Sequence, residues 1–187
     1  MITYTGESVF PKNNIAPSIF SVGVSLARLP RFTGHTRDWY SVLCHTMVVT
    51  ELMSKKHRIH GVLHDAPEAC VADVPTPWKT VAAKKREAVL LKRIYRDLGL
   101  ALPTPMEAEA VTVADRAALA AEAHVLGHPA ADEYWANPSK KAVELTEKAM
   151  EDCAMYRDDP QLAGTAYVNL VNLYVGKNAT LALIPSE

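Results

Sequence analysis

The sequence has few cysteines, almost no net charge and no long apolar run. Its 187 residues include three cysteines and carry a formal net charge of -1. Cys44, Cys70 and Cys153 are widely spaced, odd in number and without a CxxC pair, which argues against a disulfide scaffold and a thiolate zinc finger and fits a reducing compartment. No stretch approaches the roughly 20 apolar residues of a membrane helix, and the start lacks the basic and apolar regions of a signal peptide. We therefore expect a cytoplasmic protein with no membrane partner.

The near-neutral charge also limits the partners of the chain. Sites for nucleic-acid polymers usually carry a large basic excess, which this sequence does not have. A small phosphorylated molecule needs only a local group of donors. We therefore expect no nucleic-acid polymer as a partner, and mononucleotides stay compatible with the composition.

Apolar residues follow the helical period along almost the whole chain, and no useful length alternates with the period of a strand. Prolines, glycines and capping residues divide the pattern into about six to seven helices. These are expected near residues 15–29, 39–56, from 57 onward, 76–98, 104–125, from 139 onward and 159–176. Pro67 predicts a kink or break in the third, and Thr76 is a plausible N-cap for the fourth. We expect one all-α domain over residues 1–187, with a core at about 15–125 and C-terminal helices at about 139–176.

The most informative run is His64-Asp65-Ala66-Pro67-Glu68, with a lone His45 upstream and Asp115 downstream. Two imidazoles and two carboxylates suit Zn, Mn, Fe or Co and leave coordination positions open for water and a phosphate oxygen. Neighbouring helical residues point about 100° apart, so His64 and Asp65 can share an ion only if it lies at the helix edge. His45 and Asp115 would then come from two other helices.

Each of these residues also has a simpler interpretation. His45 lies among apolar residues and could be a packed core histidine, and Asp115 could be an exposed acid paired with Arg116. Glu68 could be a solvated helix acid and Asp73 a turn residue or cap. His57 and His60 invite a rival metal interpretation, since His60 and His64 have the i, i+4 spacing of a zincin. The glutamate of that motif is missing after His60, so we interpret His57 and His60 as non-ligands.

The ligand pattern resembles that of the HD-domain metal-dependent phosphohydrolases, which have a His, a His-Asp doublet and a distant Asp. The continuation Asp73-Val74-Pro75-Thr76-Pro77-Trp78-Lys79 resembles the bacterial 5'-deoxynucleotidase branch. Two upstream runs are similar to the phage members, including the dATP triphosphohydrolases: Arg28-Leu29-Pro30-Arg31-Phe32-Thr33-Gly34-His35 and Tyr40-Ser41-Val42-Leu43-Cys44-His45. The resemblance covers roughly residues 15 to 125.

The resemblance implies a role for each matching residue. The metal ligands would be His45, His64, Asp65 and Asp115. Glu68 would act on the attacking water or bind a second ion, and Asp73 would contact the sugar or assist the leaving oxygen. The phosphate-binding set implied is Arg28, Arg31 and Lys79, with His35 as a loop residue that could contact phosphate or lie at the surface. Leu29 departs from the nucleotidases, which have a tryptophan there that helps to choose the sugar.

The function expected from the resemblance is divalent-metal-dependent hydrolysis of free deoxynucleotides to deoxynucleosides. The phage-like loop at Arg31 to His35 favours a dNTP, with dATP as one option, and release of the whole triphosphate. The alternatives are a 5'-deoxynucleotidase acting on dNMPs and a non-catalytic nucleotide-binding module. The expected cofactor is Zn, Mn or Co, with Mg and a second ion as further options. The resemblance also implies a homo-oligomer, in the host cytoplasm if a phage encodes it.

Overall fold

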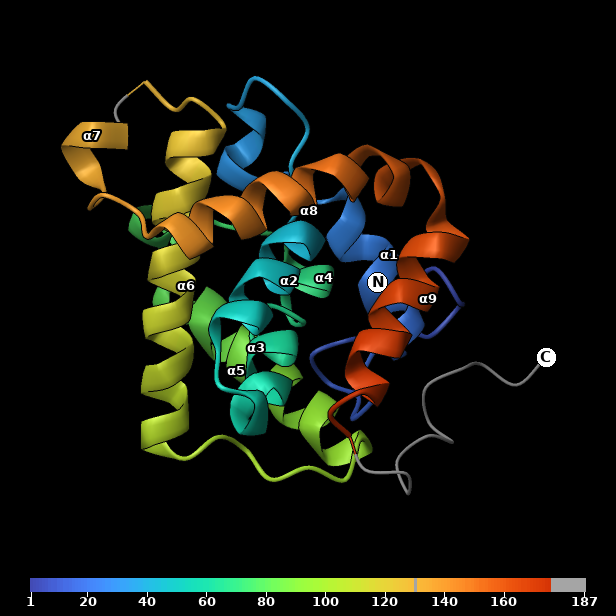
Figure 1. The fold of residues 1–187 in the computed structure, drawn as a ribbon. Coiled ribbons are helices and arrows are strands. Elements are labelled where there is room, and N and C mark those ends of the chain that lie inside the picture. Colours follow the sequence, from blue (N-terminus) through green and yellow to red (C-terminus); the bar gives the residue numbers. More distant parts are fainter. Residues whose placement is uncertain (130, 176–187) are drawn as a thin grey trace.

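The computed structural model describes residues 1–129 and 131–175 (Figure 1). Within these residues the chain is all-α, as expected, and β-structure is limited to isolated bridges. The helices are α1 (Ile19–Arg28), α2 (Val42–Leu52), α3 (Arg58–Leu63), α4 (Glu68–Val71), α5 (Val81–Asp97), α6 (Pro105–Val125), α7 (Ala131–Tyr134), α8 (Lys140–Asp158) and α9 (Pro160–Asn172). Three 3-10 turns connect them: η1 (Arg31–Gly34), η2 (Lys55–His57) and η3 (Thr76–Trp78).

Strong local signals set several helix starts where the sequence predicts them. Thr104 caps α6 in a capping box with Glu107, and Pro105 occupies the first turn, where its missing N–H costs nothing. The Ser139 hydroxyl caps α8, and the Asp159 carboxylate caps α9. The predicted end of the last helix at Gly176 lies outside the described residues.

Other boundaries differ from the prediction. The first helix begins at Ile19, not near Ile15, because the Ser18 hydroxyl accepts from the Ser21 N–H and caps the helix after Pro17. Thr80, not Thr76, caps α5, by accepting from the Ala83 N–H. The predicted break at Pro67 is confirmed, since α3 ends before it and α4 begins after it. Helix α7 was not predicted. The described residues therefore form more helical segments than the six to seven expected.

Close packing of α1 against α9 forms one side of the core (Figure 1). A Cβ at Gly23 would lie 2.5 Å from the Tyr167 Cβ, and a Cβ at Gly164 would lie 2.5 Å from the Phe20 ring. Glycine at both positions therefore permits a separation of the two helices that any larger residue would prevent.

The central helix α2 contacts α1, α3, α6 and α8, and α8 crosses over it in Figure 1. A disulfide joins Cys44 of α2 to Cys153 of α8, with their Cα atoms 6.2 Å apart. The spacing of the cysteines argued against a disulfide scaffold and did not predict this single pair, because folding brings together residues separated by 109 positions. Among the described residues, Cys70 is the free thiol.

Candidate metal centre

The structure brings the four predicted metal ligands together from three parts of the chain. His45 Nε2 lies 3.1 Å from Asp115 Oδ1 and 3.6 Å from Asp65 Oδ2. His64 Nε2 lies 3.1 Å from Asp65 Oδ2 and 3.4 Å from His45 Nε2. The group His45, His64 and Asp115 could hold a metal ion, and Asp65 Oδ2 lies beside it.

The break before α4 explains how adjacent residues reach one point. His64 is the C-cap of α3, and Pro67 precedes α4. Between them the Ala66 N–H donates to the Leu63 carbonyl, and the Glu68 N–H donates to the Asp65 carbonyl, which closes a tight turn. The turn places Asp65 beside His64. A continuous helix would separate the two side chains by about 100°.

Hydrogen bonds made by Nδ1 of His45 and of His64 leave the Nε2 atom of each ring available to an ion. His64 Nδ1 lies 2.7 Å from the Gly61 carbonyl, which can only accept, so Nδ1 carries the proton. His45 Nδ1 lies 2.7 Å from Glu122 Oε1 in the same way. In the neutral ring each Nε2 then presents a lone pair to the centre, as in metal sites where a carbonyl or carboxylate fixes the tautomer.

Sequence reasoning missed Glu122. Its side chain is fully buried, contacts His45 Nδ1, and lies 3.5 Å from Arg31 NH2. Glu122 follows Asp115 by seven residues, which is two turns along the same face of α6. That spacing, with an acid on an alanine-rich helix face, is a signal that could have identified it.

Opposite charges in and around the candidate metal group shift the pKa values of its members. Burial alone would raise the pKa of Asp65, but His64, His45 and Arg31 outweigh it and hold that pKa well below its usual value. Burial and Arg31 lower the pKa of His45, while Glu122 and Asp115 raise it more, to about 10. In the absence of an ion, protons therefore occupy the position that a cation would take, and metal binding should release them.

Glu68 lies at the start of α4, with 5% of its surface exposed. Burial raises its pKa to about 9, with Asp65 and Asp73 adding to the shift and Lys79 opposing it. Lys79 Nζ lies 3.3 Å from Glu68 Oε1 and 3.0 Å from Glu87 Oε1. Glu68 Oε2 is buried and has no hydrogen-bond partner among the described residues. An unsatisfied buried carboxyl oxygen is costly, so it indicates a position that a bound group would complete.

The other predicted substrate residues are in different environments. Arg31 NH1 lies 3.0 Å from Asp73 Oδ2, so these two side chains form an ion pair next to Glu122. Arg28 is exposed, and its Nε donates to the Arg157 carbonyl on α8. His35 is exposed at the end of η1. Of the predicted cations, Lys79 contacts Glu68 and Arg31 contacts Asp73.

His57 and His60 lie in a separate cluster. The Nε2 atoms of His57 and His60 are 3.8 Å and 3.6 Å from Glu107 Oε1, and His60 Nδ1 is 2.8 Å from the Tyr95 hydroxyl. His60 therefore packs between α3, α5 and α6 and does not join His64.

Comparisons with known proteins give a partial match. No family model matches the chain. The chain is 32% identical over 111 residues to YfdR of Escherichia coli (strain K12), described as an uncharacterized protein. The match covers 58% of this chain and 61% of YfdR, so the chain spans less than two thirds of that relative.

None of the helices in the described part of the chain is long and apolar enough to cross a bilayer.

Proposed function

We propose that this protein is an HD-type phosphohydrolase that uses a divalent metal to hydrolyse free deoxynucleotides to deoxynucleosides. The observation that carries the proposal is the convergence of His45 Nε2, His64 Nε2 and Asp115 Oδ1, with Asp65 Oδ2 beside them. Nitrogen and carboxylate donors of this kind suit Zn, Mn or Co. With Glu68 and Asp73 close by, such a set would combine a metal site with acid–base groups.

The chemistry divides between the ion and the chain. A divalent ion in this group would supply Lewis acidity to a phosphate oxygen and would acidify water. Glu68 is suited to proton transfer. In the metal-free protein its pKa of about 9 keeps it protonated near neutral pH, and a cation bound beside it would lower that pKa and favour the carboxylate that can take a proton from water. Lys79 holds one oxygen of Glu68, and the unsatisfied Oε2 is left for the reacting group.

Phosphate charge needs cationic help as the bond breaks. Lys79 and Arg31 are the cations tied to the acidic residues of this site, through Glu68 and Asp73. For Arg31 to contact phosphate, it would exchange Asp73 for the substrate. The role of Arg28 rests on the resemblance, since its Nε hydrogen bond goes to α8.

The leading substrate is a dNTP, dATP among the options, with release of triphosphate. A dNMP cleaved to orthophosphate is the alternative. A non-catalytic nucleotide-binding module is the third candidate. The buried, unpartnered oxygen of Glu68 favours an enzyme over a binding module, because such a costly group has a use in proton transfer.

An assay of every dNMP and dNTP with Mn, Co, Mg and Zn tests the proposal, with the products separated by chromatography. We expect a deoxynucleoside together with triphosphate from a dNTP, or with orthophosphate from a dNMP. Asp65→Asn should abolish hydrolysis and lower metal occupancy in a folded helical protein. Asp152→Asn, an exposed change on α8, is the matched control and should leave both unchanged. A fully metallated and active Asp65→Asn variant would contradict the assignment, as would cleavage of oligonucleotides alone.

A further inference from the structure

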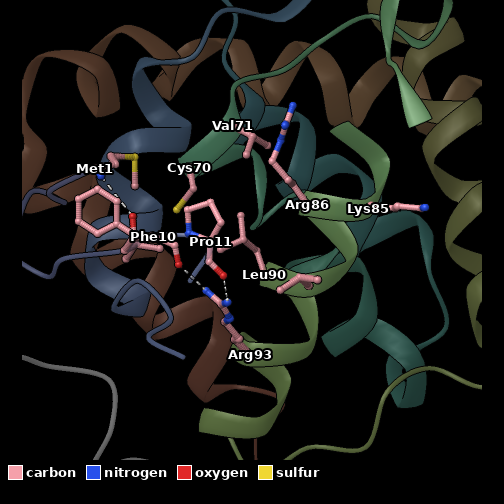
Figure 2. Close-up of a pocket in the computed structure, with 11 residues that line it drawn as sticks. Met1, Phe10, Pro11, Cys70, Val71, Lys85, Arg86, Leu90 and Arg93 are labelled. Carbon is pink, nitrogen blue, oxygen red and sulfur yellow. Dashed lines mark hydrogen bonds between the residues drawn. The ribbon is translucent and has the colours of Figure 1, made fainter. Parts of the chain in front are cut away.

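A cavity of about 490 Å³ lies between the N-terminal segment and helices α4 and α5, away from the metal group (Figure 2). Its lining includes Phe10 and Pro11 from the N-terminal segment, Cys70 and Val71 from α4, and Leu90 from α5. None of the candidate metal ligands lines it, and neither does Glu68. Its volume is in the range of small-molecule sites, roughly 300–1,000 Å³.

The charged side chains in this lining all have one sign. Among the described residues, Lys85, Arg86 and Arg93 line the cavity and no acidic residue does. Arg93 is about nine-tenths buried, and its guanidinium donates to the carbonyls of Phe10 and Pro11 (Figure 2) and to that of Ile15. The described residues provide Arg93 with carbonyl acceptors but no ion-pair partner. A buried cation without a counter-charge is costly, so an anion in the cavity would be stabilised.

The walls of the cavity are apolar. Figure 2 shows Leu90, Pro11 and Phe10 around the hollow, with Val71 on the α4 side. Lys85 and Arg86 are exposed on α5 at its edge. Apolar walls with a few fixed polar groups are the usual composition of a small-molecule site.

We propose that this cavity is a second ligand site, and that it takes an amphiphilic anion with an apolar body and a carboxylate or phosphate-monoester head. The apolar body packs against Phe10, Val71 and Leu90, and the head group lies near the cations of α5. The occupant also contacts Cys70 and Val71 of α4, the helix that begins with Glu68. The site is therefore separate from the metal centre but lies against the helix that carries its proposed acid–base residue.

Calorimetry with decanoate and decyl phosphate tests the site, using decylammonium and inorganic phosphate as probes that lack one half of the chemistry. We expect one molecule of an anionic amphiphile to bind per chain, and neither control probe to bind. Cys70 supplies a local readout, since it is the free thiol and lines the cavity. Decanoate or decyl phosphate should slow its alkylation by iodoacetamide. Equal binding of decylammonium, or binding without protection of Cys70, would overturn the proposal.

Substitutions on α5 provide two test variants and a matched control. Val89 is exposed and lines the cavity, so Val89→Trp should block binding without disturbing the core. Arg86→Gln should weaken binding about tenfold, roughly 1.4 kcal/mol. Lys92→Gln makes the same charge change at an exposed position outside the lining and should have no effect. Metal content should stay unchanged in all three variants, so this test is independent of the proposed hydrolysis. Equal weakening by Arg86→Gln and Lys92→Gln would show general charge attraction and no site.

Discussion

His45 and Glu122 form a hydrogen-bonded pair in which neither side chain has exposed surface, with Nδ1 and Oε1 2.7 Å apart. Arg31 NH2 lies 3.5 Å from the other oxygen of Glu122. The carboxylate therefore lies between a histidine of the candidate metal group and the guanidinium of Arg31. A carboxylate that accepts from Nδ1 of a histidine fixes the orientation of the ring and makes its Nε2 a stronger ligand for a metal.

We predict that Glu122→Ala lowers metal affinity by about 10- to 100-fold, as expected when the partner of a ligating histidine is removed. Glu122→Gln should have a smaller effect, because its amide oxygen can still accept from His45 Nδ1. Metal titration followed by calorimetry measures both affinities, and circular dichroism shows whether each variant is folded.

A different result is expected if Glu122 serves only to neutralise Arg31. If Glu122 only neutralised Arg31, the double variant Arg31→Met, Glu122→Gln would recover wild-type metal affinity. If it positions His45, the double variant should bind metal no better than Glu122→Gln. Full recovery in the double variant would therefore contradict the positioning role.

Glu68 should act on the reaction and not hold the primary ion. We predict that Glu68→Ala slows hydrolysis by roughly a hundredfold or more, the contribution of a general acid–base group. One tightly bound ion per chain should persist, because the other side chains supply the donors. Turnover and metal analysis on the same preparation test both statements. Loss of the ion in Glu68→Ala would make Glu68 a direct ligand.

The sequence predicts those parts of the structure that depend on local signals. The capping box at Thr104 and the proline at position 67 act over a few residues, and α6 and the break before α4 lie where they were predicted. The start of α5 was wrong because two threonines, each a plausible cap, lie four residues apart. In the structure Thr80 takes the role by accepting from the Ala83 N–H, and Thr76 begins the 3-10 turn η3.

Long-range relationships were harder to predict. The ligand set could be proposed because the residue types themselves specify metal chemistry. The Arg31–Asp73 pair and the Cys44–Cys153 disulfide join residues 42 and 109 positions apart, and no periodicity encodes either pairing. The two-turn spacing of Glu122 from Asp115 lies between these cases, since helical geometry predicts a shared face but not its contact with His45.

The disulfide predicts a thiol count. Denatured protein that has not been reduced should show one reactive thiol, from Cys70, and three after reduction. A Cys70→Ser variant should show none before reduction and two afterwards. Titration with Ellman's reagent measures each value. Three thiols in unreduced protein would show that Cys44 and Cys153 are not joined.

The raised pKa of Glu68 predicts how the stability of the metal-free protein depends on pH. Its carboxyl would ionise near 4.5 in the unfolded chain, whereas burial raises its pKa to about 9 in the folded protein. Between these values the unfolded state loses the proton and the folded state keeps it. The contribution of Glu68 to stability is therefore fully present below pH 4.5 and is lost as pH rises toward 9.

Glu68→Gln removes this titration and keeps the shape of the side chain. After metal removal, we expect the variant and the wild type to melt at similar temperatures near pH 4.5, and the variant to melt several degrees higher at pH 8. About 1 kcal/mol corresponds to roughly 2–4 °C in a domain of this size. Glu109→Gln, at an exposed position on α6, is the control and should show no such trend. A Glu68→Gln protein that melts below the wild type at pH 8 would mean that the ionised carboxylate stabilises the fold through Lys79, and that burial is the smaller effect.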